Sequence, residues 1–459
     1  MPFARLAGKH FWTRKVPVAR LKRLSTRARG QKAALLALAS VPLIMTLGNS
    51  MLIPVLPGIQ AALGITPLQS SLLITVYSVM AILLIPVAGY LSDRIGRRKV
   101  IVPSLILAGA GGAICGWAGG WEGVWTGAGD SAYGWILAGR LLQGMGAAGA
   151  MPIVLPLVGD MFRSEAQVSA GLGLIETANT FGKVLSPIVG SALAILAWQA
   201  PFWSIPALCA LSLLLLLTLV RVPARRDGAA PPPPAKQFLA KVWRLFRINA
   251  RWLSALFLIG GLAMFILFGL LFYLSETLEK EHGLHGIRKG LVLAIPLAVL
   301  CTASFAAGKA IGKRKAAMKW IIAGGCALAA AGIAACLPLE ATAVRVACLS
   351  VAGLGIGAAL PCLDAFLTEG IAKEERGSIT SLYSSMRFVG VAAGPPVASL
   401  LMRSSVSLLL AAMAACAAAA GALALLLHAG QGQPQQDAQR AMLLAARERA
   451  RRRGGAGAR

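Results

Sequence analysis

The chain has 459 residues, of which 57% are hydrophobic and only 14% are charged, and its mean hydropathy is +0.72. A soluble protein of this length would form two or three domains with charge spread along the chain. Here the charge is clustered between long apolar runs, which excludes an ordinary soluble protein. We interpret the net charge of +28 as a topology signal that faces anionic lipid, and we expect no nucleic-acid partner.

Twelve apolar runs are long enough to cross a membrane, for which about 20 residues are needed. They predict an all-α integral membrane protein with twelve transmembrane helices. The runs begin near Ala33, Gln69, Val100, Tyr133, Ala166, Trp198, Trp252, Lys289, Met318, Thr342, Ser378 and Ser404.

The basic residues are distributed unequally between the two sides of such a protein. If both tails and the even-numbered connections share one side, that side holds most of the 45 Lys and Arg residues. The opposite side holds only Lys280, Arg288, Lys289, Arg345 and Arg403. The positive-inside rule then predicts a multi-pass protein of the cell membrane with both termini in the cytoplasm. Residues 1–32 and 429–459 are predicted to be basic cytoplasmic tails.

A proline-rich stretch divides the spans into two sets of six. Residues 221–250 contain four consecutive prolines and predict a cytoplasmic linker between an N-terminal bundle, 33–220, and a C-terminal bundle, 251–428. The two halves also resemble each other, since "GKVLSPIVG" from Gly182 aligns with "GVAAGPPVA" from Gly390. We therefore expect two pseudo-symmetric six-helix bundles that move around a site at mid-membrane depth.

Three motifs narrow the family. They are "GYLSDRIGRRK" at 89–99, "RLLQGMGAA" at 140–148 and "GKVLSPIVGS" at 182–191. Together they resemble the signatures of the drug–proton antiporter branch of the major facilitator superfamily, in its twelve-span form with multidrug or siderophore efflux members. The third motif departs from the family pattern, because Ser186 and Ser191 stand where glycines are usual. The resemblance implies export of a small organic molecule in exchange for protons.

The first motif forms a short turn between the second and third spans. Gly96 permits a backbone conformation that other residues resist, and the basic residues suit the lipid headgroups. Topology alone would explain those basic residues. The resemblance implies that Asp93 pairs with the other half and latches the outward-open state. The predicted gating residues are Gly89, Asp93, Arg94, Gly96, Arg97 and Arg98.

The fifth span carries an aligned row of polar residues. On a helix that advances about 100° per residue, Glu176, Asn179, Thr180 and Lys183 fall on one face, and Phe181 falls on the opposite face. A carboxylate at the depth of Glu176 costs at least about 3 kcal/mol, so we expect a functional role. We predict that Glu176 binds a proton or a cationic substrate; a static ion network is the alternative.

The roles expected for the other polar residues within spans follow from their positions or from the resemblance. The family pattern places Arg140 in the proton-transfer machinery, whereas a structural arginine would only bond backbone carbonyls. Asn49, Asn179, Lys183 and Arg387 are predicted to line the substrate cavity, and Asp364 and Glu369 are interpreted as gate or loop charges. The predicted helix-packing residues are Gly182, Ser186, Pro187, Gly190, Gly394 and Pro395.

The energy source is inferred from what the sequence lacks. No G-x-x-x-x-G-K-[ST] motif occurs, so we expect an ion gradient, protons rather than sodium, and no cofactor. His282 and His285 could bind a metal on one helical face, but their loop is typical of a solvated connector, and we expect no metal. The predicted partners are a small-molecule substrate, protons and the lipid bilayer, with the monomer as the functional unit. A membrane enzyme is not expected; the alternatives left open are a proton-coupled uptake carrier and a non-transporting receptor or scaffold.

Overall fold

The computed structural model describes residues 18–120, 129–162, 165–220, 243–244, 246–310, 315–339, 341–371 and 376–427. The regular elements in this part of the chain are helices. In chain order they are α1 (Val18–Ser50), η1 (Ile53–Val55), α2 (Leu56–Leu63), α3 (Pro67–Ile95), α4 (Arg97–Gly119), α5 (Gly129–Met161), α6 (Glu165–Leu196), α7 (Ala200–Leu219), α9 (Ala250–Lys280), α10 (Gly286–Ala310), α11 (Lys315–Ala335), α12 (Thr342–Gly370), α13 (Arg376–Ser404) and α14 (Val406–Leu425).

The twelve predicted spans are confirmed. Within the described residues, twelve helical segments are long and apolar enough to cross a membrane, and each begins within five residues of the predicted start. The first segment, Gly30–Leu63, includes α1, η1 and α2. The exposed large apolar side chains of the bundle, such as Phe181 and Trp203, suit contact with lipid rather than water.

Local sequence explains where α3 begins. Thr66 and Gln69 form a capping box, in which the Thr66 hydroxyl accepts the Gln69 N–H at 3.2 Å and the Gln69 side chain accepts the Thr66 N–H at 2.8 Å. Pro67 occupies the first helical turn, where its missing N–H costs nothing. The helix ends at Ile95 because Gly96 follows with a φ of 105°, a conformation that favours glycine.

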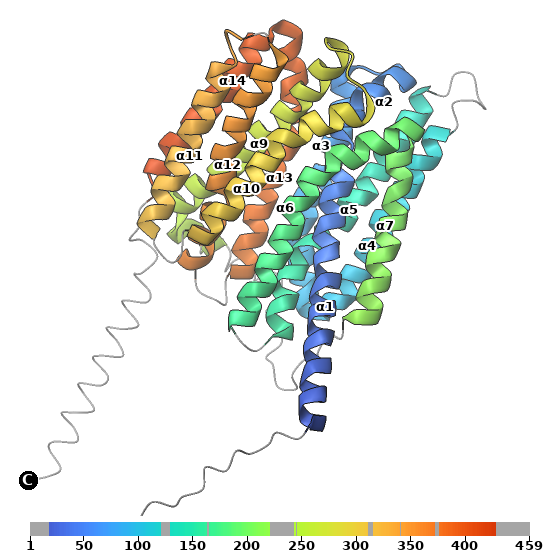
Figure 1. Cartoon of the computed structure of the whole chain (residues 1–459), viewed down its shortest axis with the longest axis vertical. Coiled ribbons are helices and arrows are strands. Elements are labelled where there is room, and N and C mark those ends of the chain that lie inside the picture. Colours follow the sequence, from blue (N-terminus) through green and yellow to red (C-terminus); the bar gives the residue numbers. More distant parts are fainter. Residues whose placement is uncertain are drawn as a thin grey trace, which may run out of the picture.

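The helices form two bundles with the same internal arrangement. In the N-terminal half, α1 packs on α6, α4 on α5, and α4 on α7; in the C-terminal half, α9 packs on α13, α11 on α12, and α11 on α14 in the same way. Figure 1 shows the first half, blue to green, beside the second half, yellow to red. This correspondence confirms the fold class predicted from the repeat.

Two helix pairs join the halves. In the first pair, α3 packs along α13, where the Thr75 hydroxyl donates to the Ala392 carbonyl at 2.7 Å. In the second pair, α6 packs along α10, where Gly290 lies against Pro187 and Ser191. The two pairs are related by the same pseudo-symmetry, since α3 corresponds to α10 and α6 to α13.

We name the two ends of the protein by their connections. The turn end carries Gly96 between α3 and α4, and the α2 end carries η1, α2 and the connection from α9 to α10. The predicted tails and linker lie mostly outside the described residues, so their boundaries stay predictions. Within the described part, α1 already begins at Val18, inside the predicted tail, and α9 begins at Ala250, where the linker was predicted to end.

Candidate functional site

The polar face of α6 points into the protein. Asn179, Thr180 and Lys183 are 5%, 7% and 9% exposed, whereas Phe181 on the opposite face is 53% exposed. The burial therefore follows the helical period that the sequence predicts. An amide, a hydroxyl and an ammonium are held inside, and an aromatic side chain is exposed on the opposite face.

Glu176 stands at the exposed end of this face. Its carboxylate accepts a hydrogen bond from the Asn179 amide at 3.3 Å, and the Asn179 oxygen accepts one from the Thr46 hydroxyl of α1 at 2.5 Å. The carboxylate is thus oriented by a chain of neutral groups. The carboxylate is exposed, whereas Asn179 and Thr180 beside it are buried.

The C-terminal half presents a matching ion pair. Asp364 of α12 lies 3.4 Å from the Arg387 guanidinium of α13, and the two side chains are 37% and 19% exposed. Glu176 interacts electrostatically with both of them, and Lys183 does the same. We name Glu176, Lys183, Asp364 and Arg387 the central cluster. It contains one acid and one base from each half.

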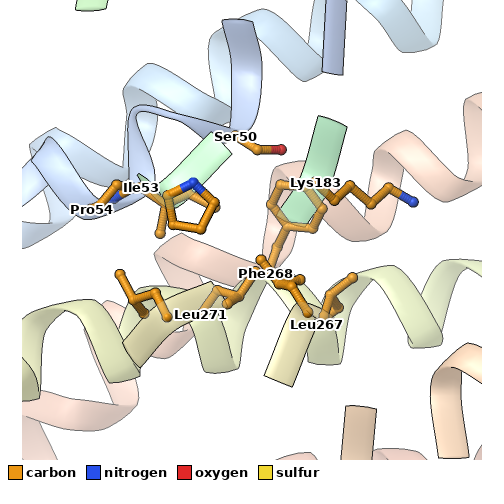
Figure 2. Close-up of a pocket in the computed structure, with 10 residues that line it drawn as sticks. Ser50, Ile53, Pro54, Lys183, Leu267, Phe268 and Leu271 are labelled. Atoms are coloured by element: carbon orange, nitrogen blue, oxygen red, sulfur yellow. The ribbon is translucent and has the colours of Figure 1, made fainter. Parts of the chain in front are cut away.

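A pocket lies next to the central cluster. Figure 2 shows the pocket with Lys183 and Ser50 beside the apolar side chains of Leu267, Phe268 and Leu271, and with the Lys183 nitrogen pointing away from them. Residues of both halves line this pocket: Ser50, Ile53, Pro54, Lys183 and Pro187 from the first, and Leu267, Phe268, Leu271, Leu293 and Leu297 from the second. The wall of this pocket is largely apolar, and Lys183 is the charged residue in its lining.

Arg140 on α5 is fully buried and forms three hydrogen bonds. It donates to the Leu73 carbonyl at 2.8 Å, to Gln143 at 2.5 Å and to Asn49 of α1 at 2.6 Å. Its guanidinium also lies 4.4 Å from the centre of the Tyr77 ring. These contacts join α1, α3 and α5 through one backbone carbonyl and two side chains, and the role of Arg140 in proton transfer stays a prediction. Asn49, predicted to line the cavity, is 5% exposed and binds this arginine.

The turn motif forms a network in the first half and also meets the second. Arg97 contacts Asp93 at 3.2 Å and binds Asp160 at the end of α5, and Arg98 donates to the Leu217 carbonyl at 3.5 Å. Gly89 faces the other half, because a Cβ there would lie 3.2 Å from the Ser381 hydroxyl. The role of Asp93 as a latch across the halves stays a prediction, as does that of Arg94.

The predicted packing residues lie where helices approach closely. A Cβ on Gly182 would lie 3.1 Å from the Leu43 carbonyl oxygen, and one on Gly394 would lie 2.7 Å from the Phe265 carbonyl oxygen. A Cβ on Gly190 would likewise contact the backbone of Met51. Ser186, where the family pattern has glycine, is buried and donates to the Gly182 carbonyl at 2.6 Å. Its hydroxyl is therefore satisfied within α6 and does not disturb the packing.

Comparison with known proteins decides the family. The model of the Major Facilitator Superfamily matches residues 38–395. The chain is 50% identical over 372 residues to the bacillibactin exporter of Bacillus subtilis (strain 168), an alignment that covers 81% of this chain and 90% of that protein. The chain belongs to the major facilitator superfamily. It is therefore a membrane transporter and not an enzyme, as the motifs predict.

More distant relatives agree with this assignment. The multidrug efflux protein YfmO of Bacillus subtilis (strain 168) is 27% identical over 380 residues, which cover 81% of this chain and 87% of that protein. Among solved structures, a D-xylose-proton symporter covers 87% of this chain and 98% of its own, with a TM-score of 0.71 and 15% identity. The human organic anion transporter MFSD10 gives a TM-score of 0.64 at 20% identity, with 87% and 99% covered. At these identities the two structures show the superfamily fold alone.

Two features of this transporter were missed in the sequence. The sequence predicts Asp364 to be a gate or loop charge but not that it pairs with Arg387 in the central cluster; the gate role stays a prediction. The sequence predicts no role for Gln60 or Glu276, although the structure joins them across the two halves at the α2 end. A signal was present, because Glu276 and Lys280 are four residues apart in an apolar span, the spacing of a helical ion pair.

Proposed function

We propose that this transporter exports a small organic molecule of the siderophore or drug-like class across the plasma membrane in exchange for protons. The observation that carries the proposal is the central cluster, in which Glu176 of one half interacts with the Asp364–Arg387 pair of the other. Charged groups at this depth are costly and are typical of substrate and ion pathways. The 50% identity to a bacillibactin exporter supports export and a siderophore-like substrate.

The distribution of basic residues supports the orientation. With both termini in the cytoplasm, the turn end faces the cytoplasm and the α2 end faces outward. The surrounding lipid is then the bilayer of the plasma membrane, and the monomer contains both halves of the site. Alternating access follows if the α6–α10 and α3–α13 pairs separate at one end at a time.

Exchange for protons follows if substrate and protons compete for the same carboxylates. A proton on Glu176 or Asp364 removes a negative charge from the cavity and turns one acceptor oxygen into an O–H donor. A substrate that donates hydrogen bonds or carries positive charge would bind the ionised carboxylates and leave when they are protonated. Such competition couples outward movement of substrate to inward movement of protons. Lys183 and Arg387 then hold the empty carboxylates in place.

The remaining predicted residues support this cycle. Asn179 orients Glu176, and Asn49 holds Arg140 beside Tyr77. The Tyr77 ring lies 6.4 Å from the ring of Phe388, the residue after Arg387 on α13. The Tyr77 ring therefore lies between Arg140 and α13 of the other half. Proton coupling through Arg140 is part of the proposal.

The test is transport in proteoliposomes with an imposed pH gradient. Siderophores, lipophilic cations and antibiotics are screened for gradient-driven uptake into vesicles that contain inverted transporter. We expect Glu176→Gln to abolish gradient-driven movement while the protein keeps its elution profile and melting temperature. The matched control is Glu281→Gln, which removes a carboxylate that pairs with Arg345 at 3.9 Å in the C-terminal half alone. If Glu176→Gln transports substrate at the wild-type rate under the pH gradient, Glu176 has no part in the mechanism. If substrate and protons move across the membrane in the same direction, the protein is an uptake carrier.

A further inference from the structure

A network of buried polar groups joins the two halves at the α2 end. Gln60 of α2 donates to Glu276 of α9 at 2.5 Å, and Lys280 of α9 donates back to the Gln60 oxygen at 3.1 Å. The Lys289 ammonium of α10 donates to the Pro54 carbonyl at 2.7 Å, and the Ser275 hydroxyl donates to the Ile53 carbonyl at 2.9 Å. We name Gln60, Ser275, Glu276, Glu279, Lys280 and Lys289 the α2-end network.

Most of the groups that make these contacts are deeply buried, whereas the Lys280 side chain is 52% exposed. Gln60 is 6% exposed, Glu276 is 3% exposed, and Lys289 is 1% exposed although it carries a charge. Burial of an ammonium and a carboxylate is costly unless each is paired and hydrogen-bonded. In this network both charges are paired, because Glu276 lies 2.7 Å from Lys280 and Lys289 lies 2.5 Å from Glu279. The closed arrangement therefore satisfies every one of these charges.

The charges of the network are all on one side of the contact. Both ion pairs belong to the C-terminal half, and the N-terminal half contributes only an amide and two backbone carbonyls. If the halves separate here, each charge keeps its own partner and exchanges an uncharged contact for water. Separation then breaks hydrogen bonds but leaves no unpaired charge, so the closed and open arrangements can be close in free energy.

The backbone of η1 is suited to this contact. Pro57 follows Ile53 by four residues and has no N–H to donate to the Ile53 carbonyl, as a continuing α-helix would. The carbonyls of Ile53 and Pro54 lie in a short 3-10 segment between two helices, where they accept hydrogen bonds from the other half. The Ile53 carbonyl also accepts the Leu56 N–H within this segment. The interruption of the first span thus leaves room for a hydrogen bond from α9 at the Ile53 carbonyl.

From these contacts we infer that the α2-end network is the outer latch of the transporter, which holds the extracellular side closed and separates when substrate is released. The inference rests on the proposed orientation and alternating access. It assigns gating roles to Gln60 and Glu276 and to the ion pair of Lys289 with Glu279. Weakening the latch shifts the population of the transporter towards the state that is open at the α2 end.

The test measures accessibility from outside, without substrate or a proton gradient. Ser50, which lines the pocket beneath the network, is replaced by Ser50→Cys, and intact cells are treated with a membrane-impermeant maleimide. The same variants without Ser50→Cys give the background from native cysteines. We expect Gln60→Ala to raise the labelling rate about tenfold, which corresponds to about 1.4 kcal/mol in the closed–open equilibrium. Lys289→Met is expected to act in the same direction.

A reciprocal exchange separates a latch from general loss of structure. Gln60→Glu places a second carboxylate against Glu276 and should raise labelling further. Combining it with Glu276→Gln restores one acid and one amide, both within reach of Lys280, and should return labelling towards the wild-type rate. Glu281→Gln should have no effect. Equal labelling in all variants, a failed rescue, or an equal rise in Glu281→Gln would overturn the latch. Labelling that follows this pattern without coupled transport would reject only the proposed export.

Discussion

The closest approach of the two halves on the α6–α10 side offers a sharp test of how they separate. Gly290 of α10 has no side chain, and a Cβ there would lie 2.5 Å from the Pro187 carbonyl oxygen and 2.9 Å from the Ser191 Cβ of α6. Ordinary van der Waals contact begins at 3.4 Å, so Gly290→Ala is short of room by 0.9 Å at the first of these atoms. A backbone carbonyl within a helix cannot rotate away, and α6 and α10 must move apart.

The free-energy cost of Gly290→Ala applies only to the state that is closed at the α2 end. Overpacking of this kind costs about 1–3 kcal/mol, and it applies only while α6 and α10 are in contact at the α2 end. Gly290→Ala should therefore shift the closed–open equilibrium by about 5- to 150-fold towards the state that is open at this end. The assay is maleimide labelling of Ser50→Cys from outside, together with the melting temperature in detergent.

The same helix provides the matched control. Gly308 also lies on α10, but a Cβ there would be 3.9 Å from its nearest neighbour, the Pro361 Cβ, and therefore has room. Gly308→Ala should label at the wild-type rate. The reasoning would be refuted if Gly290→Ala also labelled at that rate, because the two halves would then tolerate the added methyl group without separating.

Two further predictions concern the interior of the bundle. Arg140→Lys should lower the melting temperature, because one ammonium cannot reach the three acceptors that the guanidinium binds. Each buried acceptor left without a hydrogen bond costs about 1–3 kcal/mol of stability. An unchanged melting temperature would contradict the role of Arg140 in joining α1, α3 and α5. Substrate affinity of the wild type should rise with pH, because substrate and protons compete for the carboxylates of the central cluster. Binding measurements at several pH values should show a weaker rise in Asp364→Asn. At low pH this variant should bind like the wild type, since both then lack the charge, and a uniform loss of affinity at all pH values would contradict the competition.

The sequence was sufficient for the features that depend on one helix at a time. Span positions follow from the length of apolar runs, because a helix in lipid must satisfy its backbone within itself. The buried face of α6 follows from the helical period, which places Asn179 and Lys183 on the same side and Phe181 on the other. The helix end at Gly96 likewise depends only on local conformation.

The sequence was not sufficient for contacts between helices that are distant in the chain. Nothing in the order of residues states that α12 brings Asp364 to Arg387, because many pairings of twelve similar apolar helices satisfy the same periodicity. The same limit applies to Gln60, whose partner Glu276 lies in the other half. The repeat helped with the bundle arrangement, since it relates α6 to α13, but it predicts no partner for a residue that has no counterpart in the other half.

The two polar regions between the halves differ in a way that bears on coupling. The central cluster has one acid and one base in each half, so moving the halves or protonating Glu176 changes the charge that each half presents to the other. The α2-end network has its charges in one half, so its opening depends on hydrogen bonds and packing, including the contact at Gly290. A proton or substrate can favour opening only through a difference in its affinity for the two states. The central cluster meets this condition because its charges belong to both halves. The stability of the latch then sets how large the difference in affinity between the two states must be.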